Sequence, residues 1–178
     1  MLLNVLQDNI AMNNKKMVRA ALLMALAIVL QSLRLVLPLP PVLSTFIIGT
    51  LVNMMLVITC RICGLTAAVM LTLLLPVLAY MQGQLLLPLL IPVVVTGNLL
   101  YVLLVRKRGS LILTYFLPPL LKAAAMYAGA RIVLMFVYIP VGAMADNILF
   151  AMSVPQLVTG IAGIAAAERI LLKLKNSY

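Results

Sequence analysis

The chain has 178 residues, of which 66% are hydrophobic and only 9% are charged, and its formal net charge is +10. Its mean hydropathy of +1.25 leaves too few polar residues to cover a water-soluble surface, so we expect lipid to cover it. This composition excludes an ordinary soluble domain, and the length suits one domain embedded in a bilayer. In a membrane protein an excess of positive charge is explained by the orientation of the chain in the bilayer. We therefore do not expect it to bind nucleic acid.

The N-terminal segment differs from the rest of the chain. Its apolar residues are interrupted by Asn4, Asp8, Lys15 and Lys16, so it is too polar for a signal peptide. We expect residues 1–16 to form a cytoplasmic arm and residues 17–178 to form a single transmembrane helical domain.

Six long apolar runs follow the arm, and each is close to the roughly 20 residues that a helix needs to cross a bilayer. Prolines, glycines and charged residues mark their ends. The runs cover about residues 17–37, 42–60, 65–81, 85–105, 111–139 and 147–172. Pro118 and Pro119 leave open whether the fifth run starts as a membrane helix or as an interfacial segment. The sequence therefore predicts an all-α membrane protein with six transmembrane helices.

The basic residues lie mainly on one side of this topology. Ten of the thirteen fall on the side of the N-terminus: Lys15, Lys16, Arg19, Arg61, Arg106, Lys107, Arg108, Arg169, Lys173 and Lys175. The loops on the other side contain neither Lys nor Arg. Because cytoplasmic segments of membrane proteins are enriched in basic residues, we expect both termini in the cytoplasm.

The three other basic residues, Arg34, Lys122 and Arg131, lie within apolar runs. A charged side chain in hydrocarbon costs several kcal/mol unless it faces a cavity, has a partner or reaches the interface. Arg34 is close enough to the end of its run to reach the interface, and Arg131 could either pair with Asp146 or bind a ligand. Lys122 lies deep in the membrane only if the fifth helix begins at Leu111.

The chain lacks the residues that most membrane enzymes and ion-coupled carriers need. It contains no His, and its acidic residues, Asp8, Asp146 and Glu168, all lie away from the middle of the runs. We therefore expect no metal centre, no Ser–His nucleophile and no buried proton relay, and the sequence has no phosphate-binding loop. We expect neither an enzyme nor a cofactor, so uphill transport would need energy from a partner protein.

Neutral polar side chains in the later runs, together with two of the cations, form the predicted ligand site. The candidate residues are Gln82, Gln84, Asn98, Lys122, Tyr127, Arg131 and Gln156. Asn98 follows a glycine and Gln156 follows a proline, where a helix can bend and expose polar groups; interhelical hydrogen bonds are the alternative role. Because positive charge exceeds negative charge, we expect a small water-soluble ligand with a carboxylate or another acceptor-rich group, held by Lys122 or Arg131.

Small residues and prolines mark the beginning of the transmembrane domain. Ala21 and Ala25 lie one helical turn apart, which allows another helix to approach closely. A proline-rich loop that contains Pro38, Pro40 and Pro41 follows the first run.

With this alanine strip and loop, the pattern resembles the substrate-binding S components of energy-coupling factor (ECF) transporters, small six-helix membrane proteins that capture vitamins and related micronutrients. Other segments that carry the resemblance are residues 85–104, 122–125 and 155–159. The resemblance implies a protein of the bacterial cytoplasmic membrane whose alanine strip docks on a membrane T subunit coupled to two cytoplasmic ATPases. It also implies that the proline loop forms a lid over an outward-facing site made largely by the last three helices.

The chain departs from some members of that family. It contains no His and no Trp, which makes it unlike the cobalt and nickel binders, whose site uses an N-terminal His, and unlike the thiamine binders. Two other functional classes remain open. One is a stand-alone facilitator or channel, and the other is a scaffold subunit that binds no small molecule.

Overall fold

The computed structural model describes residues 2–107, 110–137 and 143–176 of the chain, and within these ranges it contains helices and no strand. The helices are α1 (Leu2–Val36), α2 (Pro41–Ile62), α3 (Leu65–Met81), α4 (Leu90–Arg106), α5 (Leu111–Tyr115), α6 (Leu117–Phe136), α7 (Ala143–Ala151) and α8 (Val154–Asn176). The predicted all-α fold is confirmed.

Four segments are long and apolar enough to cross a membrane, as judged by length and composition. They are Asn14–Val36, Pro41–Ile62, Ile112–Phe136 and Met144–Asn176. The helices α3 and α4 are also apolar but have only 17 residues each. These lengths and compositions are those of a membrane protein.

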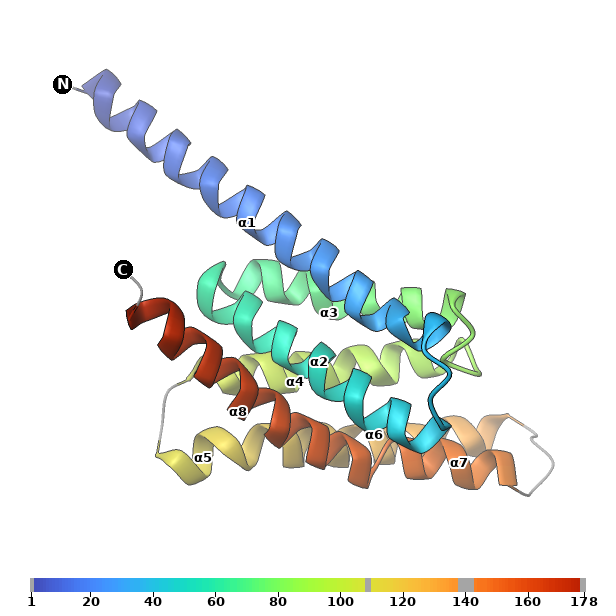
Figure 1. Ribbon diagram of the computed structural model, residues 1–178. Helices are drawn as coiled ribbons and strands as arrows, with labels where there is room; N and C mark the ends of the chain where they lie inside the picture. The colour runs from blue at the N-terminus through green and yellow to red at the C-terminus, as the bar shows by residue number, and fades with distance from the viewer. Residues whose placement is uncertain (1, 108–109, 138–142, 177–178) are drawn as a thin grey trace.

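The helices form a bundle in which the two chain ends lie on the same side (Figure 1). α2 packs against α8 and α4 packs against α6, while α1 contacts α2 and α3. α6 also contacts α8 and so joins the two pairs. α1 continues unbroken through Lys16, so the expected arm is the first part of this helix, and it extends beyond the bundle (Figure 1).

Prolines change three of the predicted helix boundaries. α4 begins at Leu90 rather than near residue 85, because Pro88 disfavours a helical conformation in the residue before it. The fifth run is divided at Phe116 into α5 and α6, whose first turn contains two prolines. The sixth run is divided into α7 and α8, and Pro155 lies in the first turn of α8, where its missing N–H is tolerated. Of the loop predicted at residues 140–146, residues 143–146 belong to α7, which corrects that prediction, whereas residues 138–142 lie outside the described residues.

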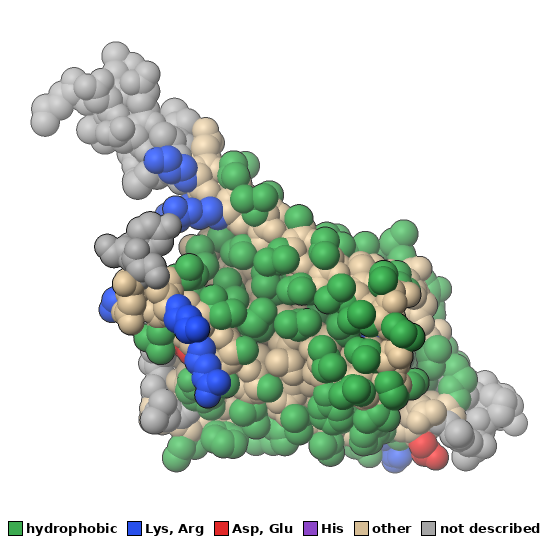
Figure 2. Space-filling view, in the orientation of Figure 1, with side chains coloured by type: hydrophobic (Ala, Val, Ile, Leu, Met, Phe, Trp, Pro, Cys, Tyr) green, Lys and Arg blue, Asp and Glu red, His purple; other side chains and the backbone are tan. Residues whose placement is uncertain are grey.

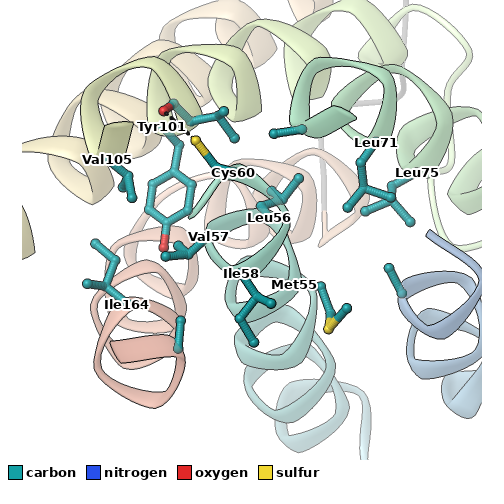
Figure 3. Packing of buried hydrophobic residues seen from close by; sticks show 14 residues of the cluster. Met55, Leu56, Val57, Ile58, Cys60, Leu71, Leu75, Tyr101, Val105 and Ile164 are labelled. Atoms are coloured by element: carbon teal, nitrogen blue, oxygen red, sulfur yellow. Dashed lines mark hydrogen bonds between the residues drawn. The ribbon is translucent and has the colours of Figure 1, made fainter. Parts of the chain in front are cut away.

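The larger of two hydrophobic cores joins α1, α2, α3, α4 and α8 (Figure 3). Leu56, Leu71 and Ile164 in this core are 0% exposed. Tyr101 is the largest fully buried side chain among the described residues, and its hydroxyl donates a hydrogen bond to the carbonyl oxygen of Gly160 at 2.8 Å. Since this bond satisfies the polar end of the side chain, the ring fills the core without an unpaired hydroxyl.

A second, smaller core lies among α4, α6 and α7, towards the end of the bundle opposite the termini. Its buried members are Leu85, Leu90, Met126, Ala130, Ile148 and Met152. Four of these six residues belong to α4, α6 and α7, so this core joins the later helices of the chain.

The surface of the bundle is mostly apolar. In the face shown in Figure 2, hydrophobic side chains cover the middle of the molecule, and most of the Lys and Arg side chains gather at the end that carries the termini. Met17, Leu22 and Val29 on α1 are each more than half exposed, at 63%, 66% and 58%. Contiguous apolar surface of this kind is unfavourable in water and suits contact with lipid or with another membrane protein.

Candidate functional site

A cavity of about 170 Å³ lies between the two cores. Leu75 of the larger core and Met126 and Met152 of the smaller core contribute to its wall. The wall also contains most of the long polar side chains inside the described bundle: Gln31, Arg34, Asn53, Gln84, Asn98, Lys122 and Gln156. The structure thus brings together Gln84, Asn98, Lys122 and Gln156 from the predicted site and adds three residues that the prediction had not included.

One face of α2 forms a continuous part of the wall. Thr45, Ile48, Gly49, Val52 and Asn53 line the cavity, and their spacing of three and four residues places them on the same side of a helix. The predicted site did not include Asn53. Its position in the middle of an apolar run was the signal that could have found it.

Lys122 is the most buried charged side chain among the described residues, with 2% of its surface exposed. Its Nζ donates to Oδ1 of Asn53 at 2.6 Å and lies 5.2 Å from the centre of the Tyr101 ring. Asn53 Nδ2 donates to Oγ1 of Thr159 at 3.1 Å, and that hydroxyl donates to the carbonyl oxygen of Pro155 at 2.6 Å. These bonds join α6, α2 and α8. The ammonium group is stabilised by the amide dipole of Asn53 and by the ring of Tyr101. No described carboxylate forms an ion pair with it.

Asn98 provides an unpaired acceptor in the wall of the cavity. The side chain is 4% exposed, and its Oδ1 has no hydrogen-bond partner within the described ranges. Leaving a buried carbonyl unpaired costs roughly 1–3 kcal/mol. The preceding residue, Gly97, lets α4 approach α6 closely, since a Cβ at residue 97 would overlap the side chain of Met126. The site therefore holds a rigidly placed acceptor that a ligand could satisfy.

Arg34 lines the cavity at the end of α1 that is distant from the N-terminus. Its Nε donates to Ser44 Oγ at 3.1 Å, and its Nη2 donates to Thr45 Oγ1 at 3.3 Å. These bonds connect the last turn of α1 to the beginning of α2 across the loop of residues 37–40. Arg34 therefore does more than reach the membrane interface, because its guanidinium group is half-buried against α2.

Three glutamine side chains form hydrogen bonds at the end of the bundle where Arg34 lies. Gln84 Nε2 donates to Gln82 Oε1 at 2.7 Å, and Gln82 Nε2 donates to Ser32 Oγ on α1 at 2.8 Å. Gln156 Nε2 donates to the carbonyl oxygen of Ala151 at 2.9 Å and so caps the end of α7. Gln82 is not among the residues that line the cavity, because its amide is directed to α1.

Tyr127 and Arg131 do not line the cavity, and both are exposed. At 3.6 residues per turn, a residue nine positions after Lys122 lies about 180° around the helix from it, and one five positions after lies about 140° away. The inward orientation of Lys122 therefore turns these two side chains away from the site. The ion pair with Asp146, one of the two roles considered for Arg131, is absent from the described part of the chain, where both residues are exposed.

The alanine strip and the proline loop lie outside the cavity. Ala21 and Ala25 are exposed on α1. Pro38 and Pro40 belong to the exposed loop, whereas Pro41 is the first residue of α2 and not part of the loop. No described atom of these prolines belongs to the wall of the cavity, so their role as a lid stays a prediction.

Comparison with protein-family models, with curated proteins and with solved structures gave no match for this chain. The function proposed below therefore depends on the cavity, the distribution of charge and the exposed face of α1.

The bonds of Asn53 generate a prediction about stability. In the variant N53L the ammonium group of Lys122 loses its acceptor, and we expect the free energy of unfolding in detergent to fall by about 1–3 kcal/mol. The double variant N53L/K122M removes both partners, so its loss should be smaller than the sum of the two single losses by about 0.5–3 kcal/mol. Strictly additive losses would show that the hydrogen bond between Lys122 and Asn53 contributes nothing.

Proposed function

We propose that this chain is the substrate-capture subunit of an ECF-type importer. It binds a small water-soluble micronutrient in the cavity and delivers it through a T subunit and two ATPases. The observation that carries the proposal is the cavity itself, which places Lys122, Asn98, Gln84 and Gln156 together in an otherwise apolar bundle. The unpaired Oδ1 of Asn98, a residue of the same wall, supports a ligand-binding role.

The proposal includes six membrane crossings with both termini in the cytoplasm. The connection from α2 to α3 lies at the same end of the bundle as the termini, and the connections after α1 and after α3 lie at the other end (Figure 1). The basic residues gather at the end with the termini (Figure 2), as the positive-inside rule requires of a cytoplasmic face. Helices of 17 residues are at the lower limit for a crossing, which allows α3 and α4 to count as spans.

In this orientation the cavity is closer to the outside of the cell. Arg34 lies in the last turn of α1, and Gln84 follows the end of α3, both far from the basic end. Lys122 lies in the second turn of α6 and forms the part of the wall nearer the cytoplasm. A solute from outside would therefore meet Arg34 before it reaches Lys122.

Single introduced cysteines test the six-crossing topology. The two native cysteines are first replaced in C60S/C63S. In intact bacteria we expect an impermeant thiol reagent to label L86C, because Leu86 is 54% exposed beside the outer end of α3. N176C should react only after the cells are permeabilised. Labelling of N176C in intact cells would show that the C-terminal end lies outside the cell, and so would refute the topology.

The capture role is tested by purifying the chain from cells and identifying any co-purified compound by mass spectrometry. A scaffold subunit would carry none. A stand-alone facilitator would carry the compound across liposome membranes without ATPases, whereas an ECF-type subunit would bind it and transport it only with its partners.

The exposed alanine strip is expected to contact the T subunit, since small side chains permit close packing of helices. In A21L and A25L, binding of the co-purified compound should stay within about twofold of the parent chain, whereas uptake with the partner subunits should fall at least about tenfold. A124L, which enlarges an exposed alanine on α6, is the matched control and should transport normally. Normal uptake by both A21L and A25L would contradict this interface.

A further inference from the structure

The wall of the cavity carries positive charge that no described side chain in it balances. Lys122 and Arg34 line the cavity, and none of the described lining residues is acidic. Glu168 pairs with Arg61 at 3.3 Å, where α8 meets the basic end of α2, and Asp146 is exposed on α7. A ligand that brings negative charge would therefore relieve an electrostatic cost that the bundle already bears.

The ammonium group of Lys122 has capacity for a ligand. It has three N–H donors, and within the described ranges only Asn53 Oδ1 accepts from it. Arg34 is only half-buried and already donates to the hydroxyls of Ser44 and Thr45, so Lys122 is the one deeply buried cation among the described residues of the wall. One such ammonium group balances one negative charge, which favours a monoanion over a phosphate monoester of about −1.5 to −2. A carboxylate is the monoanion whose two oxygens match the two remaining donors.

A second feature of the ligand follows from Asn98. Asn98 lines the cavity and its buried Oδ1 has no partner within the described ranges, so a ligand whose O–H or N–H group reaches this oxygen would satisfy it. A ligand without such a donor would keep this oxygen unpaired and lose that contribution.

The remaining wall sets the size and character of the ligand. It is apolar over much of its area and includes Ile48, Val52, Leu75, Val94 and Met126. A dry cavity of about 150 Å³ holds a benzene molecule, so the observed 170 Å³ suits a body of roughly 6–12 non-hydrogen atoms.

We infer that the cavity takes a compact monocarboxylate with an apolar body and one hydrogen-bond donor, such as a hydroxy acid. The carboxylate binds Lys122, the donor binds Oδ1 of Asn98, and the charge of Arg34 attracts the anion from outside. The inference rests on the proposed function, because it names the class of compound that the capture site recognises.

Binding of matched probes to the purified full-length chain tests the inference. The probes are 3-hydroxybenzoate, benzoate and their two amides, with 2-hydroxyhexanoate, hexanoate and their amides as an aliphatic series, measured by calorimetry and by thermal shift. We expect the hydroxy acid of at least one series to bind at least about tenfold more tightly than its amide. In K122M this preference for the acid should disappear.

Two further variants separate the parts of the site. N98L should remove the advantage of each hydroxy acid over the plain acid while the plain acid still binds. R131M removes an exposed charge outside the cavity and should leave all affinities unchanged. If K122M does not fold, the comparison of acids with amides in the parent chain and in N98L still decides the question.

The outcomes distinguish this inference from the proposed function. Amides that bind as tightly as acids, or acids that bind equally to K122M and the parent chain, would overturn the anionic ligand class and leave capture of a small molecule standing. If no probe binds at millimolar concentration, the assigned ligand class is overturned. The compound identified by mass spectrometry then shows separately whether the chain captures a small molecule at all.

Discussion

A buried ammonium group must be stabilised by something other than bulk water, and in this chain Asn53 Oδ1 and the ring of Tyr101 stabilise Lys122, while Thr159 holds the amide of Asn53 in place. The bonds run from α6 through α2 to α8, so these helices must meet at fixed positions. Gly163 makes this possible, because a Cβ there would lie only 2.6 Å from the Cβ of Asn53. The polar chain and the close helix contact therefore depend on each other.

The same constraint explains why a cavity exists between two well-packed regions. The larger core fills the bundle up to the level of Tyr101 and Leu75, and the smaller core fills the space around Met126. Between them the wall contains polar side chains whose hydrogen bonds fix their directions, so they do not collapse into the remaining space. Breaks at prolines in the later helices add backbone carbonyls that side chains such as Gln156 satisfy, which is how irregular backbone is tolerated inside a membrane protein.

The cavity and the outer face of α1 serve different parts of the proposed function. The cavity is internal and polar, whereas the exposed alanines of α1 lie on a surface that nothing in the described chain covers. If the chain supplies no energy of its own, binding and transport become separate properties, each tied to its own surface. This separation is why substitutions on α1 and in the cavity are expected to have different effects.

The sequence determined the class of protein and most of its helices, because the length and apolarity of a run are local properties that the bilayer requires. It also singled out Lys122, Asn98 and Gln156, since polar groups in apolar runs need partners wherever they lie. What it left undecided was the direction of each side chain around its helix. Only tertiary packing turned Lys122 inward and Arg131 outward, and only the packing of both α2 and α6 against α8 brought Asn53 within reach of Lys122. The residues of that pair are 69 positions apart, and no local pattern in the sequence specifies which distant helix will supply the acceptor.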